Sequence, residues 1–478
     1  MKQTYRNTVI AALAGATMLA STGCKKFLDV NDNPNLPVTA TDNLILPSTQ
    51  AGIGMVVGNN LQVFGSFYAQ YWTQNPTSSQ YKTIDQYIST SSASDRLWGI
   101  LYNDALEDIS ILEKSNNSQY VAIALIQKAY IFQLLTDAFG DVPLKEALKG
   151  NENLAPRYDT QKEVYDSIFA WTKRGIALAS TSTIGAADLV FNGNMPLWKS
   201  FGNTLLLRAY LRLSEVDPAA SQAGVRALYL TNPTFLTVDA KINYLNVGGN
   251  QNPLYAEGVG LSRTQNPKAS STAVNAYVAN NDPRLKTFYT VNAGGNVVGI
   301  PQGSFGTQPA IPPTDPAPVT GGRFATATGA VAAVAPVKLI SAAESYFLQA
   351  EAAARGWSSG DVTALFKSGI KSSFDAYGTA GYDAYVLAAP DAQLPADLAG
   401  RIKAIITQKY YAMNGNQGFE AWTEWRRTGY PAILVVSKAS ALGSTDLPAR
   451  LLYPDTEVTR NTSFPGVQLI TAKVWWDK

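Results

Sequence analysis

Histidine is absent from this sequence of 478 residues, and cysteine occurs once, as Cys24. Without histidine, Ser-His-Asp and Cys-His catalysis are excluded, and so is an imidazole base acting near neutral pH. A zinc site is not expected either, because carboxylates would be its only ligands. Oxygen ligands still allow calcium, so the sequence predicts no cofactor, with calcium as the one open exception.

Charged side chains make up only 15% of the chain. Lys2 and Arg6 are the only charges in residues 1–23, so the chain without that segment has as many basic as acidic side chains. Nucleic acids and anionic bilayer faces call for basic patches, so neither is an expected partner. Hydrophobic residues reach 46% and aromatic residues 10%, which predicts a folded body with a large core and many rings that could stack on ligands.

The N-terminus has the pattern of a bacterial lipoprotein signal. A positive start is followed by an apolar run from Val9 to Ala20, which is too short to span a bilayer. Small residues then lead into Cys24, whose thiol would accept the diacylglyceryl group, although Ser21 stands where leucine is usual. The sequence therefore predicts lipidation at Cys24. The alternative is an ordinary signal peptide with a stray cysteine.

Three regions follow from this interpretation. Residues 1–23 are the signal peptide, and residues 24–37, rich in Asn, Asp and Pro, form a lipidated tether to the membrane. Acyl chains contribute about 0.8 kcal/mol per buried methylene, so two or more give a stable anchor. Residues 38–478 are expected to form a single body, and no further segment in it is expected to approach a membrane-spanning length.

Apolar residues at helical spacing recur along this body. They predict helical pairs over about 97–214 and 341–427, with the members 97–114, 119–139, 160–179, 196–214, 341–355, 361–374, 396–413 and 417–427. Gly140 stands where a helix C-cap glycine is expected, and Pro143 stops the helix from continuing. Small residues at packing positions indicate tetratricopeptide-like repeats without a strict period. The predicted fold class is mostly α, a degenerate repeat scaffold.

Residues 231–336 differ from the helical blocks. They are rich in Asn, Gly, Pro, Thr and Ala and have few periodic runs. This composition predicts extended loops with short strands, and loops that long are usually functional or mobile. An irregular ligand-binding region and a disordered surface insertion are both consistent with it.

Aromatic residues near the start of the body are candidates for ligand contact. Phe64, Phe67, Tyr68, Tyr71 and Trp72 have the spacing of a buried helical stripe, so core packing is favoured, with Trp72 the main exception. Three more aromatic residues, Tyr81, Tyr87 and Trp98, lie in or beside a Ser/Thr/Gln/Asn-rich loop without that spacing. The predicted ligand-binding residues are therefore Trp72, Tyr81, Tyr87 and Trp98.

Glu420 and Glu424 stand one helical turn apart. Such a pair could act as the acid and base of a glycosidase. Arg426 and Arg427 follow directly, so ion pairing is the favoured interpretation. No catalytic residue is predicted.

Four segments, in order along the chain, resemble SusD/RagB-family outer-membrane lipoproteins of Bacteroidetes. They are Phe27–Asn35 (FLDVNDNPN), Asp137–Pro143 (DAFGDVP), Glu344–Trp357 (ESYFLQAEAAARGW) and Gln408–Pro431 (QKYYAMNGNQGFEAWTEWRRTGYP). The last segment is similar to that of the SusD-like subgroup. The matches cover nearly the whole chain after Cys24.

This resemblance implies four tetratricopeptide-like helix pairs and an irregular region that carries the ligand face. It implies a lipid-anchored protein on the outer face of the outer membrane, placed as a lid over a SusC-like TonB-dependent transporter. Such proteins capture oligosaccharides or, in some members, peptides, and they are not enzymes. The matching motifs lie on scaffold helices, so structural roles are implied for Asp137–Pro143, Trp422, Trp425, Arg426 and Arg427.

The leading hypothesis is therefore nutrient capture without covalent chemistry, through Trp/Tyr stacking and Asn/Gln hydrogen bonds. Two alternatives stay open at this point. One is a surface glycoside hydrolase that uses a carboxylate pair, and the other is a helical-repeat lipoprotein that scaffolds the assembly of other outer-membrane proteins.

Overall fold

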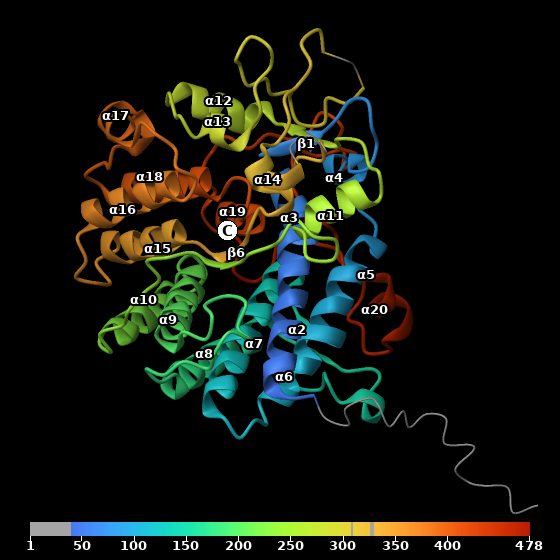
Figure 1. The fold of residues 1–478 in the computed structure, drawn as a ribbon, viewed down its shortest axis with the longest axis vertical. Coiled ribbons are helices and arrows are strands. Elements are labelled where there is room, and N and C mark those ends of the chain that lie inside the picture. The colour runs from blue at the N-terminus through green and yellow to red at the C-terminus, as the bar shows by residue number, and fades with distance from the viewer. Residues whose placement is uncertain (1–39, 307–308, 326–328) are drawn as a thin grey trace, which may run out of the picture. The chain divides into compact units, whose positions relative to one another are not determined.

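The structure is a computed structural model that describes residues 40–306, 309–325 and 329–478. The first helix in the described part of the chain is α2 (Asp42–Met55). The predicted signal peptide, Cys24 and the tether lie outside the described residues. Residues 42–478 form one compact unit. Figure 1 shows its helices, with the short strands scattered among them.

The elements of the first half are mostly helical. After α2 come η2 (Val56–Asn60), α3 (Leu61–Tyr68), β1 (Trp72–Gln74), α4 (Lys82–Asp85), α5 (Ser92–Gly99), η3 (Ile100–Leu106) and α6 (Glu107–Leu112). They are followed by α7 (Ser118–Phe139), β2 (Val142–Pro143), η4 (Gly150–Glu152), β3 (Tyr158–Asp159), α8 (Gln161–Leu178), α9 (Met195–Arg212) and α10 (Pro218–Tyr229).

Short elements then alternate with loops before the helices return. They are β4 (Ala240–Ile242), α11 (Pro253–Gly260), β5 (Pro267–Ala269), α12 (Ser271–Ala279), α13 (Leu285–Phe288), η5 (Pro318–Thr320), α14 (Gly329–Ala333) and β6 (Val337–Ile340). The last helices are α15 (Ala342–Ala354), α16 (Val362–Asp375), α17 (Tyr382–Ala388), η7 (Pro390–Ala392), α18 (Leu398–Met413), α19 (Gly418–Thr428) and α20 (Asp455–Arg460).

The predicted helical pairs are confirmed. Helices α7, α8, α9, α15, α16, α18 and α19 begin and end within two residues of the predicted bounds. Caps explain several of these ends: Asn117 accepts a hydrogen bond from the Gln119 amide at the start of α7, and Thr160 forms a capping box with Glu163 at the start of α8. Gly140 ends α7 with a φ of 86°, as its position predicted.

The predicted helix over 97–114 is composite. It begins earlier, as α5, passes through the π-helical segment η3 and ends as α6. A second π-helical segment, η2, joins α2 to α3 in the same way. A π turn inserts one extra residue into a helix and so rotates the side chains that follow it. These segments were not predicted, because the apolar spacing on either side of them still fits a helix.

Helix α7 is long and apolar enough to cross a membrane by length and composition, with 22 residues and a mean hydropathy of 1.3 in its most apolar window. The expectation that no segment of the body approaches that length is therefore wrong. However, 94% of that window is buried inside the protein, against α8, α9 and α6. Apolar side chains on every face of α7 pack into the core, which is why the helix is hydrophobic all round.

Residues 231–336 contain more structure than predicted. Their loops and short strands are confirmed, but α11, α12, α13 and α14 are short helices within them. Strand β5 pairs antiparallel with β1, with Ala269 opposite Trp72, and β4 pairs antiparallel with β6, with Ala240 opposite Ile340. The first pairing joins residues 231–336 to the segment after α3, and the second joins them to the segment before α15. The described part of this region is therefore not a disordered insertion.

Candidate functional site

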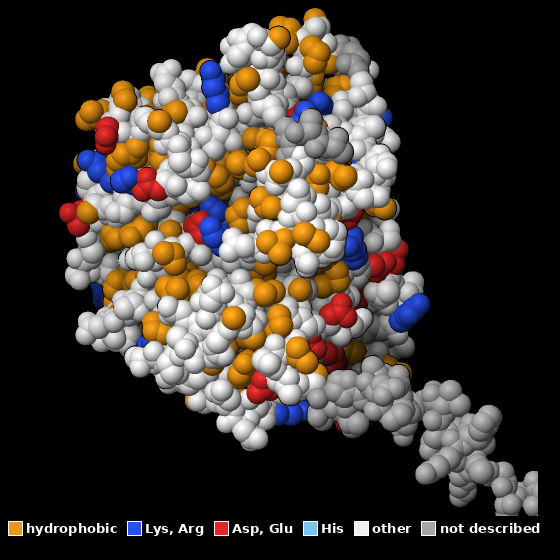
Figure 2. Space-filling view, in the orientation of Figure 1, with side chains coloured by type: hydrophobic (Ala, Val, Ile, Leu, Met, Phe, Trp, Pro, Cys, Tyr) orange, Lys and Arg blue, Asp and Glu red, His pale blue; other side chains and the backbone are white. Residues whose placement is uncertain are grey.

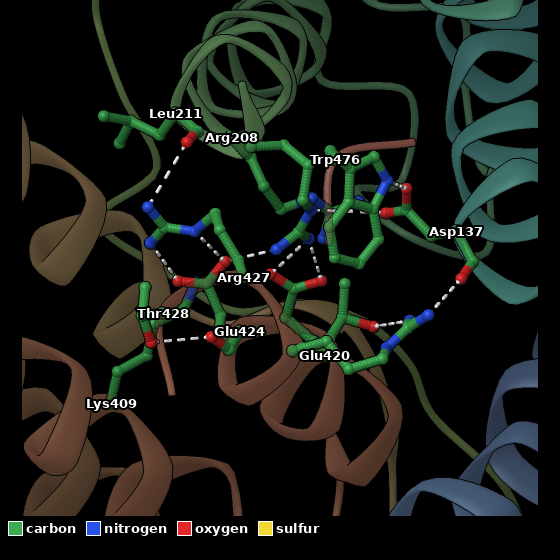
Figure 3. Close-up of polar contacts among 12 residues, drawn as sticks. Asp137, Arg208, Leu211, Lys409, Glu420, Glu424, Arg427, Thr428 and Trp476 are labelled. Atoms are coloured by element: carbon green, nitrogen blue, oxygen red, sulfur yellow. Dashed lines mark hydrogen bonds and ion pairs between the residues drawn. The ribbon is translucent and has the colours of Figure 1, made fainter. Parts of the chain in front are cut away.

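The charged residues of the Gln408–Pro431 segment lie in the interior. Glu420 and Glu424 on α19 are 8% and 3% exposed, and Arg212 from α9 pairs with both carboxylates. Arg212 Nη2 lies 2.7 Å from each carboxylate oxygen of Glu420. Arg427 Nη2 donates to Glu424 Oε2 at 2.6 Å and to Glu351 Oε2 at 2.7 Å. Figure 3 shows part of this network, in which Glu420, Glu424 and Arg427 of α19 lie close to α9.

The cations decide the ionisation of these carboxylates. Burial alone would raise the pKa of Glu424, but Arg427, Lys409 and Arg212 hold it well below its usual value. Burial also opposes ionisation of Glu420, and Arg212 with Lys409 again lowers its pKa. Both groups are ionised, paired and shielded from solvent, so neither can act as the proton donor that a glycosidase requires.

The predicted pairing with neighbouring arginines is confirmed for Arg427. Arg426 instead donates to two backbone carbonyls, those of Asp137 and Ala449, each at 2.8 Å. Its guanidinium carbon lies 3.8 Å from the centre of the Trp422 ring. Asp137 itself accepts hydrogen bonds from Tyr165 at 2.6 Å and from Trp476 at 2.8 Å. The motif residues therefore tie α7, α19 and the C-terminal segment together.

The four predicted ligand-binding residues are all buried. Trp72 on β1 is 0% exposed, Tyr87 is 4% and Trp98 is 6%. Trp98 packs between Tyr102 and Phe139, with ring centroids 4.8 Å and 5.2 Å away. In this structure these three residues present no free ring face to a ligand, because neighbouring side chains cover them. As ligand contacts they are still predictions that no bound ligand has tested.

Tyr81 differs from the other three because it lines a pocket. The pocket, called here the Tyr81 pocket, has a volume of about 180 Å³. Tyr81, which is 8% exposed, and the core residue Phe64 of α3, which is 4% exposed, form its aromatic wall, and its amides come from Asn59 and Asn60 on η2 and from Gln80. The extra residue of the π turn η2 helps to bring two consecutive asparagines to this wall.

One polar atom at this pocket, Asn60 Oδ1, is buried without a hydrogen-bond partner among the described residues. Buried polar atoms are nearly always paired, and an unpaired one costs roughly 1–3 kcal/mol. Asn60 is therefore the amide of the pocket wall with an unused acceptor.

The charges at the pocket are already paired. Glu257, at the end of α11, accepts hydrogen bonds from Asn59, Arg96 and Arg263, each at 2.6 Å. Burial opposes the ionisation of Glu257, but these three donors together lower its pKa. The pocket thus combines amides and the edge of two rings with one carboxylate shared by two arginines, so its hydrogen-bonding groups suit a hydroxyl-rich ligand.

A hydrogen-bonded loop holds the rim of the pocket. Gln74 on β1 accepts from the Tyr81 amide at 2.7 Å and donates to Ser78 Oγ at 2.8 Å. Asn75 donates to the Gln265 carbonyl at 2.6 Å, and Asn266 accepts from the Gln80 amide at 3.1 Å. The rim is therefore fixed by segments nearly 200 residues apart.

Asp85 anchors this rim from beneath. It is 1% exposed and accepts hydrogen bonds from Thr73 at 2.7 Å, from the Gln74 amide at 2.8 Å and from Gln302 at 2.5 Å. Burial raises its pKa to about 6, although these hydrogen bonds act in the opposite direction. Among the described residues, no lysine or arginine forms an ion pair with it.

The described residues offer no cluster of side chains that could hold a metal ion. Within the described ranges, no three Asp, Glu, His or Cys side chains come together as potential metal ligands. The expectation that calcium could bind stays untested.

Sequence reasoning identified Tyr81 and missed the rest of its pocket. Asn59, Asn60, Glu257 and Arg263 carry no motif, and Asn59 meets Glu257 across 198 residues of sequence. The one available signal was the pair of adjacent asparagines inside an otherwise apolar helical run.

Comparison with solved structures shows a shared fold. A chitin-binding SusD homolog from Flavobacterium johnsoniae is 23% identical, with a TM-score of 0.74 over 90% of this chain and 98% of the other. A SusD homolog from Bacteroides vulgatus is 20% identical, with a TM-score of 0.75 over 91% and 97%. A SusD-like protein from Bacteroides thetaiotaomicron is 21% identical, with a TM-score of 0.74 over 91% and 99%.

A comparison with curated proteins found no match. A family model, described as "Starch-binding associating with outer membrane", matches residues 34–454, which include the network and the Tyr81 pocket. That description names the binding of a polysaccharide and association with the outer membrane. This chain belongs to the SusD-like family of proteins associated with the outer membrane.

Proposed function

We propose that this protein is a lipid-anchored lipoprotein on the outer face of the outer membrane, which captures neutral oligosaccharides and delivers them to a SusC-like TonB-dependent transporter. The family description names starch, and one structural relative is a chitin-binding protein. Both polymers are neutral glycans. The single observation that carries the proposal is the Tyr81 pocket, with its rings, its amides and the unpaired Oδ1 of Asn60.

The chemistry of the pocket favours a sugar ring over a charged ligand. Aromatic faces pack against the C–H face of a sugar, while Asn and Gln side chains both donate to and accept from hydroxyls. Glu257 is shared by Arg96 and Arg263, and of the two arginines only Arg263 lines the pocket, so the charges on the pocket wall itself balance. The face of the molecule in Figure 2 is likewise dominated by uncharged side chains, with Lys, Arg, Asp and Glu scattered over it.

The volume of the pocket limits what it holds. Pockets that enclose a drug-sized ligand usually have a volume of roughly 300–1,000 Å³. At about 180 Å³ the Tyr81 pocket holds one part of an oligosaccharide, and the remainder would extend over the surface. Intrinsic affinity would then be modest, and the transporter would supply further contacts.

The direct test is calorimetry with maltoheptaose, with a chitin oligosaccharide and with a peptide mixture. The variants are Gln80→Ala and Asn60→Ala, whose side chains make no hydrogen bond within the described chain. Each is expected to weaken glycan binding by about tenfold, the equivalent of roughly 1.4 kcal/mol. The control is Gln468→Ala, which removes an amide outside the pocket that donates only to the nearby Gly466 carbonyl, at 3.4 Å.

Two results would count against this assignment. If only peptides bind, the ligand is a peptide and not a glycan. If glycan binding is unchanged in both pocket variants, the glycan site lies elsewhere on the protein. Partnership with a transporter needs its own test, which is mild detergent extraction followed by affinity purification. Co-purification of a large barrel is expected, whereas a stable, ligand-competent protein isolated alone would contradict delivery to a transporter.

A further inference from the structure

A second and larger cavity lies on the helical scaffold, between α8, α9 and α10. It has a volume of about 630 Å³ and is closed at one end by the turn at residues 231–234. This volume falls within the range of roughly 300–1,000 Å³ in which proteins enclose small molecules. It shares no lining residue with the Tyr81 pocket.

The walls of this cavity are mainly apolar. Leu206 and Leu228 contribute buried side chains, and Ile176 lines the cavity from α8. Tyr210 is 6% exposed and its ring stacks on Phe169, with centroids 4.4 Å apart and planes 16° apart, so it backs the wall and offers little open ring surface. A stacked aromatic pair holds its position, so the wall is preformed and does not depend on a ligand to order it.

The charge on this cavity is of one sign. Lys173 and Lys199 line it, and no Asp or Glu does. Neither lysine forms an ion pair within the described chain. Lys162, which lies on α8 together with Lys173, does pair with Asp166, at 3.1 Å. Lys173 Nζ lies 5.8 Å from the centre of the Tyr210 ring, beside the apolar wall. An apolar cavity with two unneutralised ammonium groups is complementary to an apolar anion.

We propose that the cavity between α8, α9 and α10 is a second binding site, for a small amphipathic carboxylate such as a medium-chain fatty acid. The alkyl chain would lie along Ile176, Ala177 and Ala227, which are backed by the buried Leu206, Leu228 and Tyr210. Lys173 and Lys199, both exposed, would hold the carboxylate at the mouth of the cavity. Burial of the alkyl chain supplies most of the affinity, and the solvent-screened lysines add to it. This inference does not depend on the glycan site.

The test is calorimetry with dodecanoate on the lipid-free chain that starts at Lys25, which retains the compact unit of residues 42–478. Saturable binding is expected. The double variant Lys173→Gln, Lys199→Gln and the cavity-filling variant Ala177→Trp should each weaken it by about tenfold or more. Methyl dodecanoate, which lacks the charge, should bind about tenfold more weakly than dodecanoate.

Matched controls separate the cavity from general effects. Ala170→Trp adds the same ring to an exposed position of α8 that does not line the cavity, and Lys162→Gln removes a paired lysine from the same helix. Both should bind dodecanoate as the parent protein does, and all variants should keep the parent's melting temperature. The proposal is overturned if no saturable binding occurs below about 1 mM, if the cavity variants bind normally, or if acidic peptides bind while dodecanoate does not.

Discussion

Glu424 shows how a single buried carboxylate holds several elements together. It is 3% exposed and pairs with Arg212 of α9, with Lys409 of α18 and with Arg427 of its own helix. Removing one partner of such a group leaves the other charges buried and uncompensated, which usually costs about 3–5 kcal/mol. The sequence motif is therefore explained by stability and not by ligand contact.

We expect Glu424→Gln to lower the free energy of unfolding by about 3–5 kcal/mol, measured by urea denaturation at pH 7. Asp375→Asn is the control, because its pair with Lys371 is exposed and should contribute less than about 1 kcal/mol. Since the folded-state pKa of Glu424 is lowered, its stabilisation is present above the unfolded-state pKa and is lost as the pH falls. Equal effects of the two variants would contradict the network's role.

Asp85 is expected to make the opposite contribution. Its pKa is raised from about 4 in the unfolded chain to about 6 in the folded protein, so its ionisation costs stability as the pH rises through that interval. Below the unfolded-state pKa the cost disappears. Two pKa units correspond to about 3 kcal/mol.

The check is the stability difference between the parent protein and Asp85→Asn, measured by urea denaturation from pH 7 to pH 4. The asparagine does not ionise, so the parent should gain up to about 3 kcal/mol relative to the variant as the pH falls. Using the difference removes the contributions of the other carboxylates. A difference that does not change with pH would mean that Asp85 is not perturbed by burial.

At the scale of elements, the contact between α3 and α19 fixes the scaffold beside the Tyr81 pocket. A Cβ placed on Gly65 would lie 2.0 Å from the backbone nitrogen of Phe419 and 2.3 Å from the carbonyl carbon of Gly418. The two helices therefore approach backbone to backbone, which only glycine permits. No spacing rule in the sequence identifies which glycine serves such a contact.

We expect Gly65→Ala to destabilise the protein by about 3 kcal/mol or more, because backbone atoms cannot move aside as a side chain can. Gly52→Ala on α2 is the matched control. Its added Cβ would meet Ile100 at 3.5 Å and Ala105 at 3.6 Å, which is ordinary contact, and alanine is the better helix former by about 1 kcal/mol. Thermal denaturation should therefore show a lower midpoint for the first variant and an equal or higher one for the second.

At the scale of the whole molecule, membrane attachment depends on a residue outside the described part. If Cys24 carries the lipid, mass spectrometry of the mature protein will give an N-terminal diacylated cysteine and no residues from 1–23. Cys24→Ser should move the protein from the membrane fraction to the soluble fraction, since acyl chains supply the anchoring energy at about 0.8 kcal/mol per methylene. A mature N-terminus at another residue would favour an ordinary signal peptide.

The sequence by itself determined the local structure. Apolar spacing and caps located α7, α8, α9, α15, α16, α18 and α19, since a helix depends on residues three and four apart. The stripe of Phe64, Phe67 and Tyr68 was correctly interpreted as core for the same reason. The absence of histidine and the adjacent arginines limited what Glu420 and Glu424 could do.

Only the tertiary structure decided which of the candidate side chains line a pocket. Tyr81, Tyr87 and Trp98 have similar local settings in the sequence, yet of these and Trp72 only Tyr81 lines the pocket. The difference arises from partners such as Glu257, far along the chain and brought close by the β1–β5 pairing. The packing of α8, α9 and α10 likewise brings Lys173 and Lys199 to one cavity that no Asp or Glu lines. Contacts between residues far apart in sequence are properties of the packed chain, and no local pattern encodes them.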